Sequence, residues 1–186
     1  MPKPKKCKIC KEPFEPVRQL QPTCEKYECM VAYTEKHLQK RQKEKTKQHN
    51  KDRKAFNESD KSFLKRNAQM LINKYARLRD YNENGLRCVT CDSKTGKRDG
   101  GHFLPTSGYS AIRYNTNQIH QQCVKCNQYQ GGMPKEYRLF MIEKYGTEYV
   151  ENLEAQKGVL RSYDVAYYQK LIRVVRKKIK KLEQRM

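Results

Sequence analysis

The spacing of the cysteines most constrains how this chain can fold. All eight fall into four close pairs, which are Cys7 with Cys10, Cys24 with Cys29, Cys88 with Cys91, and Cys123 with Cys126. Two such pairs brought together provide the four thiolates of a closed, tetrahedral zinc site. Disulfides are the alternative, but no apolar signal segment follows the first residues and disulfides are rare in reducing compartments. The sequence therefore predicts two structural zinc sites, one from the first four cysteines and one from the last four.

Composition and charge limit the functions that the chain can have. Of 186 residues, 36% are hydrophobic and 33% are charged, which is too polar for one large core and favours small units held by metal. The 41 Lys and Arg residues against 20 Asp and Glu residues give a net charge of +21. This excess predicts a polyanionic partner, with nucleic acid favoured over an anionic membrane surface. No apolar run approaches the roughly 20 residues that cross a bilayer, so we expect a cytoplasmic protein without a membrane partner.

Changes in composition predict four segments. Residues 1–30 form a zinc knuckle, for which a disordered basic tail is the alternative. Residues 31–58 are rich in Lys, Arg, Glu and Gln without an apolar stripe, which predicts a solvated helical linker or a partly disordered arm. This segment is either a charged spacer or an arm that binds phosphates. Residues 59–160 form a core with flanking helices, and residues 161–186 form a basic amphipathic helix that either lies on DNA or pairs with a second copy in a homodimer.

The expected elements combine short strands with helices, so the fold class is α+β. Apolar spacing predicts a helix that begins near Ser59 or Asp60 and ends at Asn84-Gly85, packed against the central metal unit. Short strands are expected through residues 100–105 and 119–122. Helices are expected over residues 136–145, over 147–156 and from 162 onward, with Pro134 suited to a first helical position.

The loop between Cys91 and Cys123 displays residues that suit phosphodiester hydrolysis. His102 follows Gly100-Gly101, and its imidazole can take a proton from water near neutral pH while the glycines admit a phosphate. The amide of Asn115 or Asn117 could orient that ring. The alternative is that His102 is a structural residue or a zinc ligand.

An amide follows the second knuckle directly. The oxygen of Asn127, together with phosphate oxygens and water, suits Mg²⁺ or Mn²⁺, and such an ion stabilises the charge that develops in phosphodiester cleavage. His120 is the weaker candidate for the base, because it lies in an expected strand where packing or DNA contact is plausible.

Three elements of this region carry a resemblance to a known family: Asp99-Gly100-Gly101-His102-Phe103, Arg113-Tyr114-Asn115, and Ile119-His120-x2-Cys123-x2-Cys126-Asn127. They resemble the phage NinG/Rap recombination proteins and, more broadly, HNH endonucleases of the ββα-metal (His-Me finger) group with a zinc-clamped core. The N-terminal knuckle and the lysine-rich segment match that layout too.

The resemblance implies a structure-specific DNA endonuclease that acts on Holliday junctions and D-loops. It implies His102 as general base, Asn127 as ligand of a catalytic Mg²⁺ or Mn²⁺, and the central cysteines as structural zinc ligands. Many HNH enzymes have an acidic ligand where this chain has Gly101, so we expect Asp99, or Asn127 with water and phosphate, to fill that role. Asn115 is assigned to orient the base, although Gln118 occupies the place where many HNH motifs have Asn.

Basic and polar side chains near the expected site and on the last helix are predicted to contact DNA, namely Arg98, Arg113, His120, Lys125, Arg173, Arg176 and Lys177. Other readings are a non-catalytic zinc-finger nucleic-acid-binding protein, a zinc-dependent scaffold for partner proteins, and an HNH nuclease with sequence specificity. The Gly-Gly-His segment and the Asn after the last cysteine favour the nuclease, since a binding finger needs neither. Symmetric cutting of a four-way junction would favour a homodimer.

Overall fold

The computed structural model describes residues 3–185, which divide into two compact units between Phe56 and Asn57. The first unit pairs β1 (Lys5–Lys6) with β2 (Pro13–Phe14) in an antiparallel hairpin beside the first four cysteines. The α+β expectation is confirmed, with helices in the majority and small sheets. Among the described residues, no helix combines the length and the apolar character that crossing a membrane requires.

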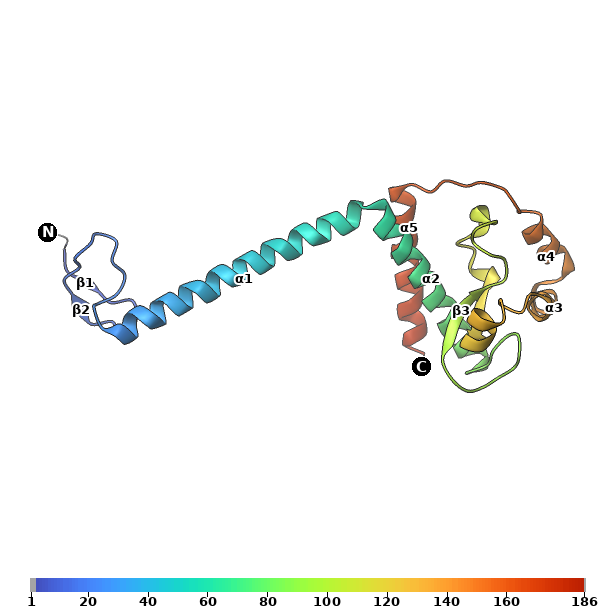
Figure 1. Ribbon diagram of the computed structural model, residues 1–186, viewed down its shortest axis with the longest axis horizontal. Coiled ribbons are helices and arrows are strands. Elements are labelled where there is room, and N and C mark those ends of the chain that lie inside the picture. The colour runs from blue at the N-terminus through green and yellow to red at the C-terminus, as the bar shows by residue number, and fades with distance from the viewer. Residues whose placement is uncertain (1–2, 186) are drawn as a thin grey trace. The chain divides into compact units, whose positions relative to one another are not determined.

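The lysine-rich segment is a single long helix, α1 (Tyr27–Ser59), coloured blue to green in Figure 1. Cys29 is its one buried residue, so the helix is solvated along almost its whole length. Strong helix formers and pairs one turn apart, such as the 2.8 Å bond from Gln48 Nε2 to Asp52 Oδ1, support it without a core. The helix begins within the knuckle, because Cys29 belongs to its first turn.

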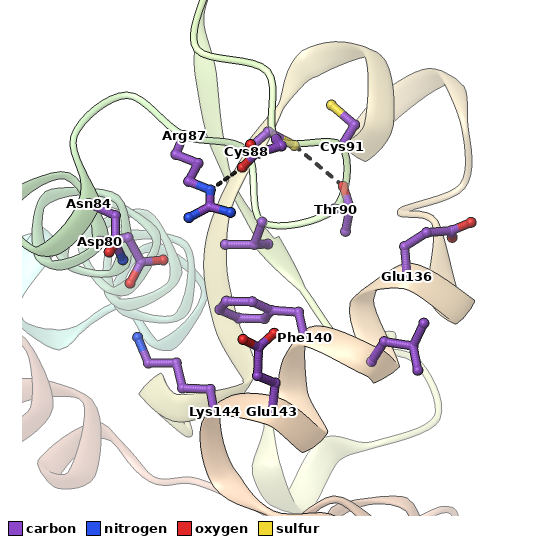
Figure 2. A pocket seen from close by; sticks show the side chains of 13 residues that line it. Asp80, Asn84, Arg87, Cys88, Thr90, Cys91, Glu136, Phe140, Glu143 and Lys144 are labelled. Carbon is purple, nitrogen blue, oxygen red and sulfur yellow. Dashed lines mark hydrogen bonds and ion pairs between the residues drawn. The ribbon is translucent and has the colours of Figure 1, made fainter.

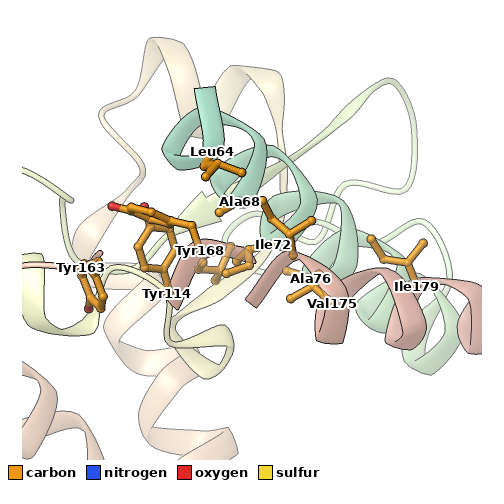
Figure 3. Close-up of a cluster of buried hydrophobic side chains, with 11 residues drawn as sticks. Leu64, Ala68, Ile72, Ala76, Tyr114, Tyr163, Tyr168, Val175 and Ile179 are labelled. Carbon is orange, nitrogen blue, oxygen red and sulfur yellow. The ribbon is translucent and has the colours of Figure 1, made fainter. Parts of the chain in front are cut away.

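The main core of the second unit lies between α2 (Lys61–Asn84) and α5 (Val165–Glu183) (Figure 3). Asp60 caps α2 by accepting the Phe63 amide at 2.5 Å, and Gly85 ends it with φ +66°. Asp164 caps α5, two residues later than expected. The apolar stripe of α5 is covered by α2 within the same chain, so that stripe is not free to pair with a second copy.

A two-stranded antiparallel sheet forms the centre of the unit, from β3 (Arg98–His102) and β4 (Ile119–Cys123). The first strand lies a few residues before the expected place. Helix α2 packs on this hairpin (Figure 1), as expected. Short 3₁₀ turns, η1 (Ser110–Ile112) and η2 (Thr116–Gln118), fill the connection between the strands.

The chain leaves β4 through a π-helical turn, η3 (Lys125–Tyr129), and continues into α3 (Pro134–Tyr145) and α4 (Thr147–Glu154). Pro134 stands in the first turn of α3, as expected. Both helices share a second core with the segment after β3, formed by Phe103, Leu104, Tyr109, Tyr137, Met141, Val150 and Leu153.

Gly100 allows β3 to lie directly against α2, and this contact yields a prediction. A Cβ at Gly100 would lie 2.8 Å from the Asn73 carbonyl oxygen and 2.9 Å from its Cα. We expect Gly100→Ala to lower the free energy of unfolding by about 1–3 kcal/mol, because backbone must shift. Urea unfolding of the zinc-loaded protein measures this. Gly108→Ala is the matched control, since nothing lies within 4 Å of its added Cβ, and equal effects of the two substitutions would contradict the packing argument.

Candidate metal centres and active site

Each set of four cysteines has the geometry of a tetrahedral metal site. Within each set the four sulfur atoms lie within 4.8 Å of one another. The Cys10–Cys24 and Cys91–Cys123 sulfur pairs are both 3.8 Å apart. This equals the edge of about 3.8 Å that a tetrahedron with Zn–S bonds of about 2.3 Å requires, and it far exceeds an S–S bond of about 2.05 Å. Both sets therefore fit structural zinc.

Backbone amides donate to sulfur atoms of the second cluster, and their effect on the pKa is clearest at Cys88. The Cys123 amide donates to Cys88 Sγ at 3.2 Å, and the Cys126 amide donates to Cys123 Sγ at 3.4 Å. Burial alone would raise the pKa of the Cys88 thiol, but hydrogen bonds from the Thr90 hydroxyl and from backbone amides outweigh it and lower the pKa to about 6. Cys88 is therefore a thiolate at neutral pH, which is the form that zinc binds.

His102 ends β3 and faces α2. Its Nε2 lies 2.9 Å from the amide nitrogen of Gln69. Arg113 Nε donates to Gln69 Oε1 at 3.0 Å, which keeps the oxygen of this amide away from His102. Gln69 therefore donates to His102 Nε2, and the proton of the neutral ring is on Nδ1, which is buried without a partner among the described residues.

The surroundings of His102 keep its ring neutral. Burial and then the charge of Arg113 lower the pKa of His102 to about 4. The imidazole is therefore neutral across the neutral pH range and has a lone pair, and a pKa this low makes it a weak base.

The amide that contacts His102 is Gln69, not Asn115, Asn117 or Gln118. Asn115 donates to the Tyr149 hydroxyl at 3.1 Å and accepts the Asn117 amide at 2.9 Å, so it caps η2. Gln118 donates to the Ile112 carbonyl at 2.7 Å. Gln69 lies 33 positions before His102 on another element, and no motif in the sequence points to it.

Asp99 and Asn127 lie together at the other end of β3. Asn127 Nδ2 donates to Asp99 Oδ2 at 3.2 Å, and Gln128 Nε2 donates to the same oxygen at 2.6 Å. The contact with Asp99 uses the nitrogen of the Asn127 amide, so Asp99 orients this amide and leaves its oxygen available. The π-helical turn η3, a feature often found at functional sites, carries Asn127 and Gln128.

The sequence suggested that Gly101 admits a phosphate. In the structure it makes room for the protein's own side chains instead. A Cβ at Gly101 would lie 1.9 Å from Gln122 Oε1 and 3.1 Å from Asn127 Oδ1. The glycine therefore lets two amides approach the backbone of β3.

Two residues expected to contact DNA are instead part of the interior. Arg98 is 5% exposed, and its guanidinium donates to the carbonyls of Leu86, Ser93 and Thr95. His120 is 0% exposed, with Nδ1 2.9 Å from Asp80 Oδ2. A side chain so enclosed cannot reach a phosphate, so these two predictions are wrong. The sequence does not distinguish a basic residue that faces solvent from one such as Arg98, which binds the carbonyls of the loop between α2 and β3, here called the zinc loop.

The remaining basic residues of that set are accessible to different degrees. Lys125, Arg173, Arg176 and Lys177 are exposed. Arg113 is half-buried, bonded to Gln69 and placed 5.9 Å from the centre of the Tyr114 ring. The positive charge of Arg113 lowers the pKa of the nearby His102.

A groove of about 700 Å³ lies beside the second cysteine cluster, between the end of α2, the zinc loop and α3 (Figure 2). Phe140 and Leu139 supply apolar lining, while Glu136, Glu143 and Lys144 supply mixed charge. Neither His102 nor Asn127 lines it, so this groove is separate from the candidate active site.

Metal removal tests the two cysteine clusters separately. We expect the protein to hold two zinc ions, one for each cluster, and Cys88→Ser and Cys7→Ser each to remove one. Only Cys88→Ser should unfold the β3–β4 region, because its cluster joins the segment before β3 to the end of β4, at the open end of that hairpin. Zinc content by mass spectrometry and amide hydrogen exchange measure the two effects. Two retained zinc ions in Cys88→Ser would contradict the assignment.

The Gln69 contact predicts how the pKa of His102 can be changed. Gln69→Glu places a carboxylate at His102 Nε2, and an anionic acceptor favours the protonated ring. The pKa of His102 should rise from about 4 toward or above its ordinary value, measured by NMR titration of the ring. Gln69→Met is the control, because it removes the amide without adding charge. A pKa that is the same in both variants would show that the amide of Gln69 does not contact the ring in solution.

Comparisons with known proteins identify the family of this chain. The family model described as NinG, Bacteriophage Lambda NinG protein, matches residues 1–185. Protein ninG of Escherichia phage 933W is 31% identical over 171 residues, which cover 83% of this chain and 82% of that protein. Protein ninG of Escherichia phage lambda is 34% identical over 96 residues, which cover 51% of this chain and 46% of that protein. No solved structure matches significantly. The chain belongs to the NinG family of phage proteins.

Proposed function

We propose that this protein is a metal-dependent, structure-specific DNA endonuclease of the HNH type that hydrolyses phosphodiester bonds in branched recombination intermediates, such as Holliday junctions and D-loops. The observation that carries the proposal is the placement of His102 and Asn127. An antiparallel hairpin leads into a helical turn, with His102 at the end of one strand and the Asn127 oxygen against the preceding residue, Gly101. A zinc-binding cluster holds the turn to the hairpin.

His102 is proposed to activate the attacking water. Its pKa of about 4 keeps the ring neutral at physiological pH, so a lone pair exists. In the structure that lone pair is on Nε2 and accepts from Gln69, while Nδ1 has no partner among the residues described. If the Gln69 amide turns to present its oxygen, the ring proton moves to Nε2 and Nδ1 becomes the base, and DNA binding must also open this buried nitrogen to the attacking water. The phosphate of the substrate favours this turn by attracting Arg113 away from Gln69 Oε1.

Asn127 is proposed to hold the catalytic ion. No described residue donates to its Oδ1, and Asp99 fixes the amide through the nitrogen. Amide and carboxylate oxygens are the ligands that Mg²⁺ and Mn²⁺ prefer. When bound, such an ion supplies charge stabilisation to the transition state and to the leaving oxygen. Asp99 then acts as a positioning residue and not as the ligand that the sequence suggested.

The charge of the chain is proposed to bind the DNA backbone. The exposed Arg173, Arg176 and Lys177 of α5 and the solvated, lysine-rich α1 can neutralise phosphates without reading bases. Recognition by shape follows from such contacts. Two copies acting on one four-way junction would cut related strands symmetrically.

A second candidate is a zinc-stapled DNA-binding protein without catalysis. One observation favours it, since the lone pair of His102 is already used by Gln69 in the absence of DNA. In that case the ring serves only to join β3 to α2.

Nicking assays on labelled four-way junction, flap and linear duplex DNA with Mg²⁺ or Mn²⁺ decide between the two. We expect the wild type to cut the junction selectively and His102→Ala to lose about 10²–10⁴-fold of the rate, as is typical when a general base is removed. His49→Ala, on the exposed face of α1, is the matched control and should cut normally. Zinc content and junction binding are measured in the same preparations. Tight binding of all three DNAs with no cutting by the wild type would establish the binding protein instead.

A further inference from the structure

One buried side chain beside Gly101 has an unused acceptor. Gln122 of β4 is 0% exposed. Its Nε2 donates to the Gly132 carbonyl at 2.8 Å and to Thr90 Oγ1 at 3.2 Å, which fixes the amide. Its Oε1 is buried and has no hydrogen-bond partner among the described residues. A buried acceptor without a donor is unfavourable, so this oxygen calls for a ligand.

Asn127 has a matching arrangement across the same glycine. Its nitrogen donates to Asp99, and its oxygen lies 3.1 Å from the place of a Cβ on Gly101. Gln122 Oε1 and Asn127 Oδ1 thus lie 1.9 Å and 3.1 Å from one point, the place of a Cβ on Gly101. Two amide oxygens this close to one point carry like partial charges, and a cation bound by both would offset their repulsion.

We propose that Gln122 is a ligand of the catalytic divalent cation, alongside Asn127. This inference rests on the proposed function. Gln122 occupies the space in which a side chain at position 101 would begin, so β4 supplies the oxygen that Gly101 lacks. The cation is a hard, oxygen-binding ion such as Mg²⁺ or Mn²⁺, because both ligands are amide oxygens.

The next residue in β4 provides a matched control. Gln121 is the same residue type, is 2% exposed, and points to the other face of the hairpin because side chains alternate along a strand. Its Nε2 donates to the carbonyls of Gly85 and Arg87. Gln121→Met and Gln122→Met therefore impose similar changes on the interior, and only the second removes an oxygen beside Asn127.

Mn²⁺ binding to the full-length, zinc-loaded protein, followed by electron paramagnetic resonance, tests the proposal without an activity readout. We expect Gln122→Met and Asn127→Ala each to weaken Mn²⁺ binding by tenfold or more, and Gln121→Met to bind like the wild type. Zinc content confirms that each variant is folded. Wild-type affinity in folded Gln122→Met would overturn the assignment while leaving the nuclease proposal intact.

A compensating pair decides the matter if Gln122→Met does not fold. Gln122→Ala alone should lose Mn²⁺ binding, and Gly101→Asp with Gln122→Ala should recover it, because the space freed by Gln122 admits a carboxylate from β3. No recovery in the folded double variant would overturn the proposal. If the wild type binds no Mn²⁺, or if Asn127→Ala binds it normally, the metal centre of the proposed function is itself wrong.

Discussion

The zinc cluster of Cys88, Cys91, Cys123 and Cys126 is the constraint on which the candidate site depends. It joins the loop before β3 to the end of β4, so a zinc ion bound there would hold the two strands at one end, while hydrogen bonds hold them along their length. The same cluster fixes where η3 begins, since Cys126 belongs to that turn. Asn127 follows Cys126 directly, so the cysteine cluster fixes its place. Only 36% of the residues are hydrophobic. Metal binding at this cluster would therefore supply stability that a larger hydrophobic core would otherwise provide.

The hairpin presents its two faces to different tasks. One face packs on α2, where Gly100 allows close approach to Asn73 and His102 meets Gln69. The other carries Asp99, Gln122 and the space at Gly101, against which η3 lies. Two buried side chains of the hairpin link it to its surroundings: Arg98 donates to the carbonyls of Leu86 and Ser93, and His120 contacts Asp80 of α2. The His102 ring and the Asn127 amide thus meet β3 on opposite faces, at His102 and beside Gly101, and each has its own support: α2 contacts the proposed base, and the cysteine cluster positions the proposed metal ligand.

The features that could be predicted from the sequence are those that depend on residues close together in the chain. The cysteine pairs, the Asp60 cap, the Gly85 terminator and Pro134 each act within a few residues, and the structure confirms them. The contacts of His102 and Gly101 depend instead on packing between distant elements. Gln69 is one of many polar residues on α2, and Gln122 reads as an ordinary strand residue. Arg98 and His120 show the same limit, because burial depends on the folded environment and not on residue type.

The central claim is that this site hydrolyses phosphodiester bonds through an ion held by Asn127. Single-turnover cleavage of a four-way junction by Asn127→Ala, alongside its junction affinity and zinc content, tests that claim most directly. The account predicts a folded protein with unchanged zinc content that binds the junction like the wild type and does not cut it. Normal cleavage by this variant would contradict the account, because the site would then work without the residue that the zinc cluster places there.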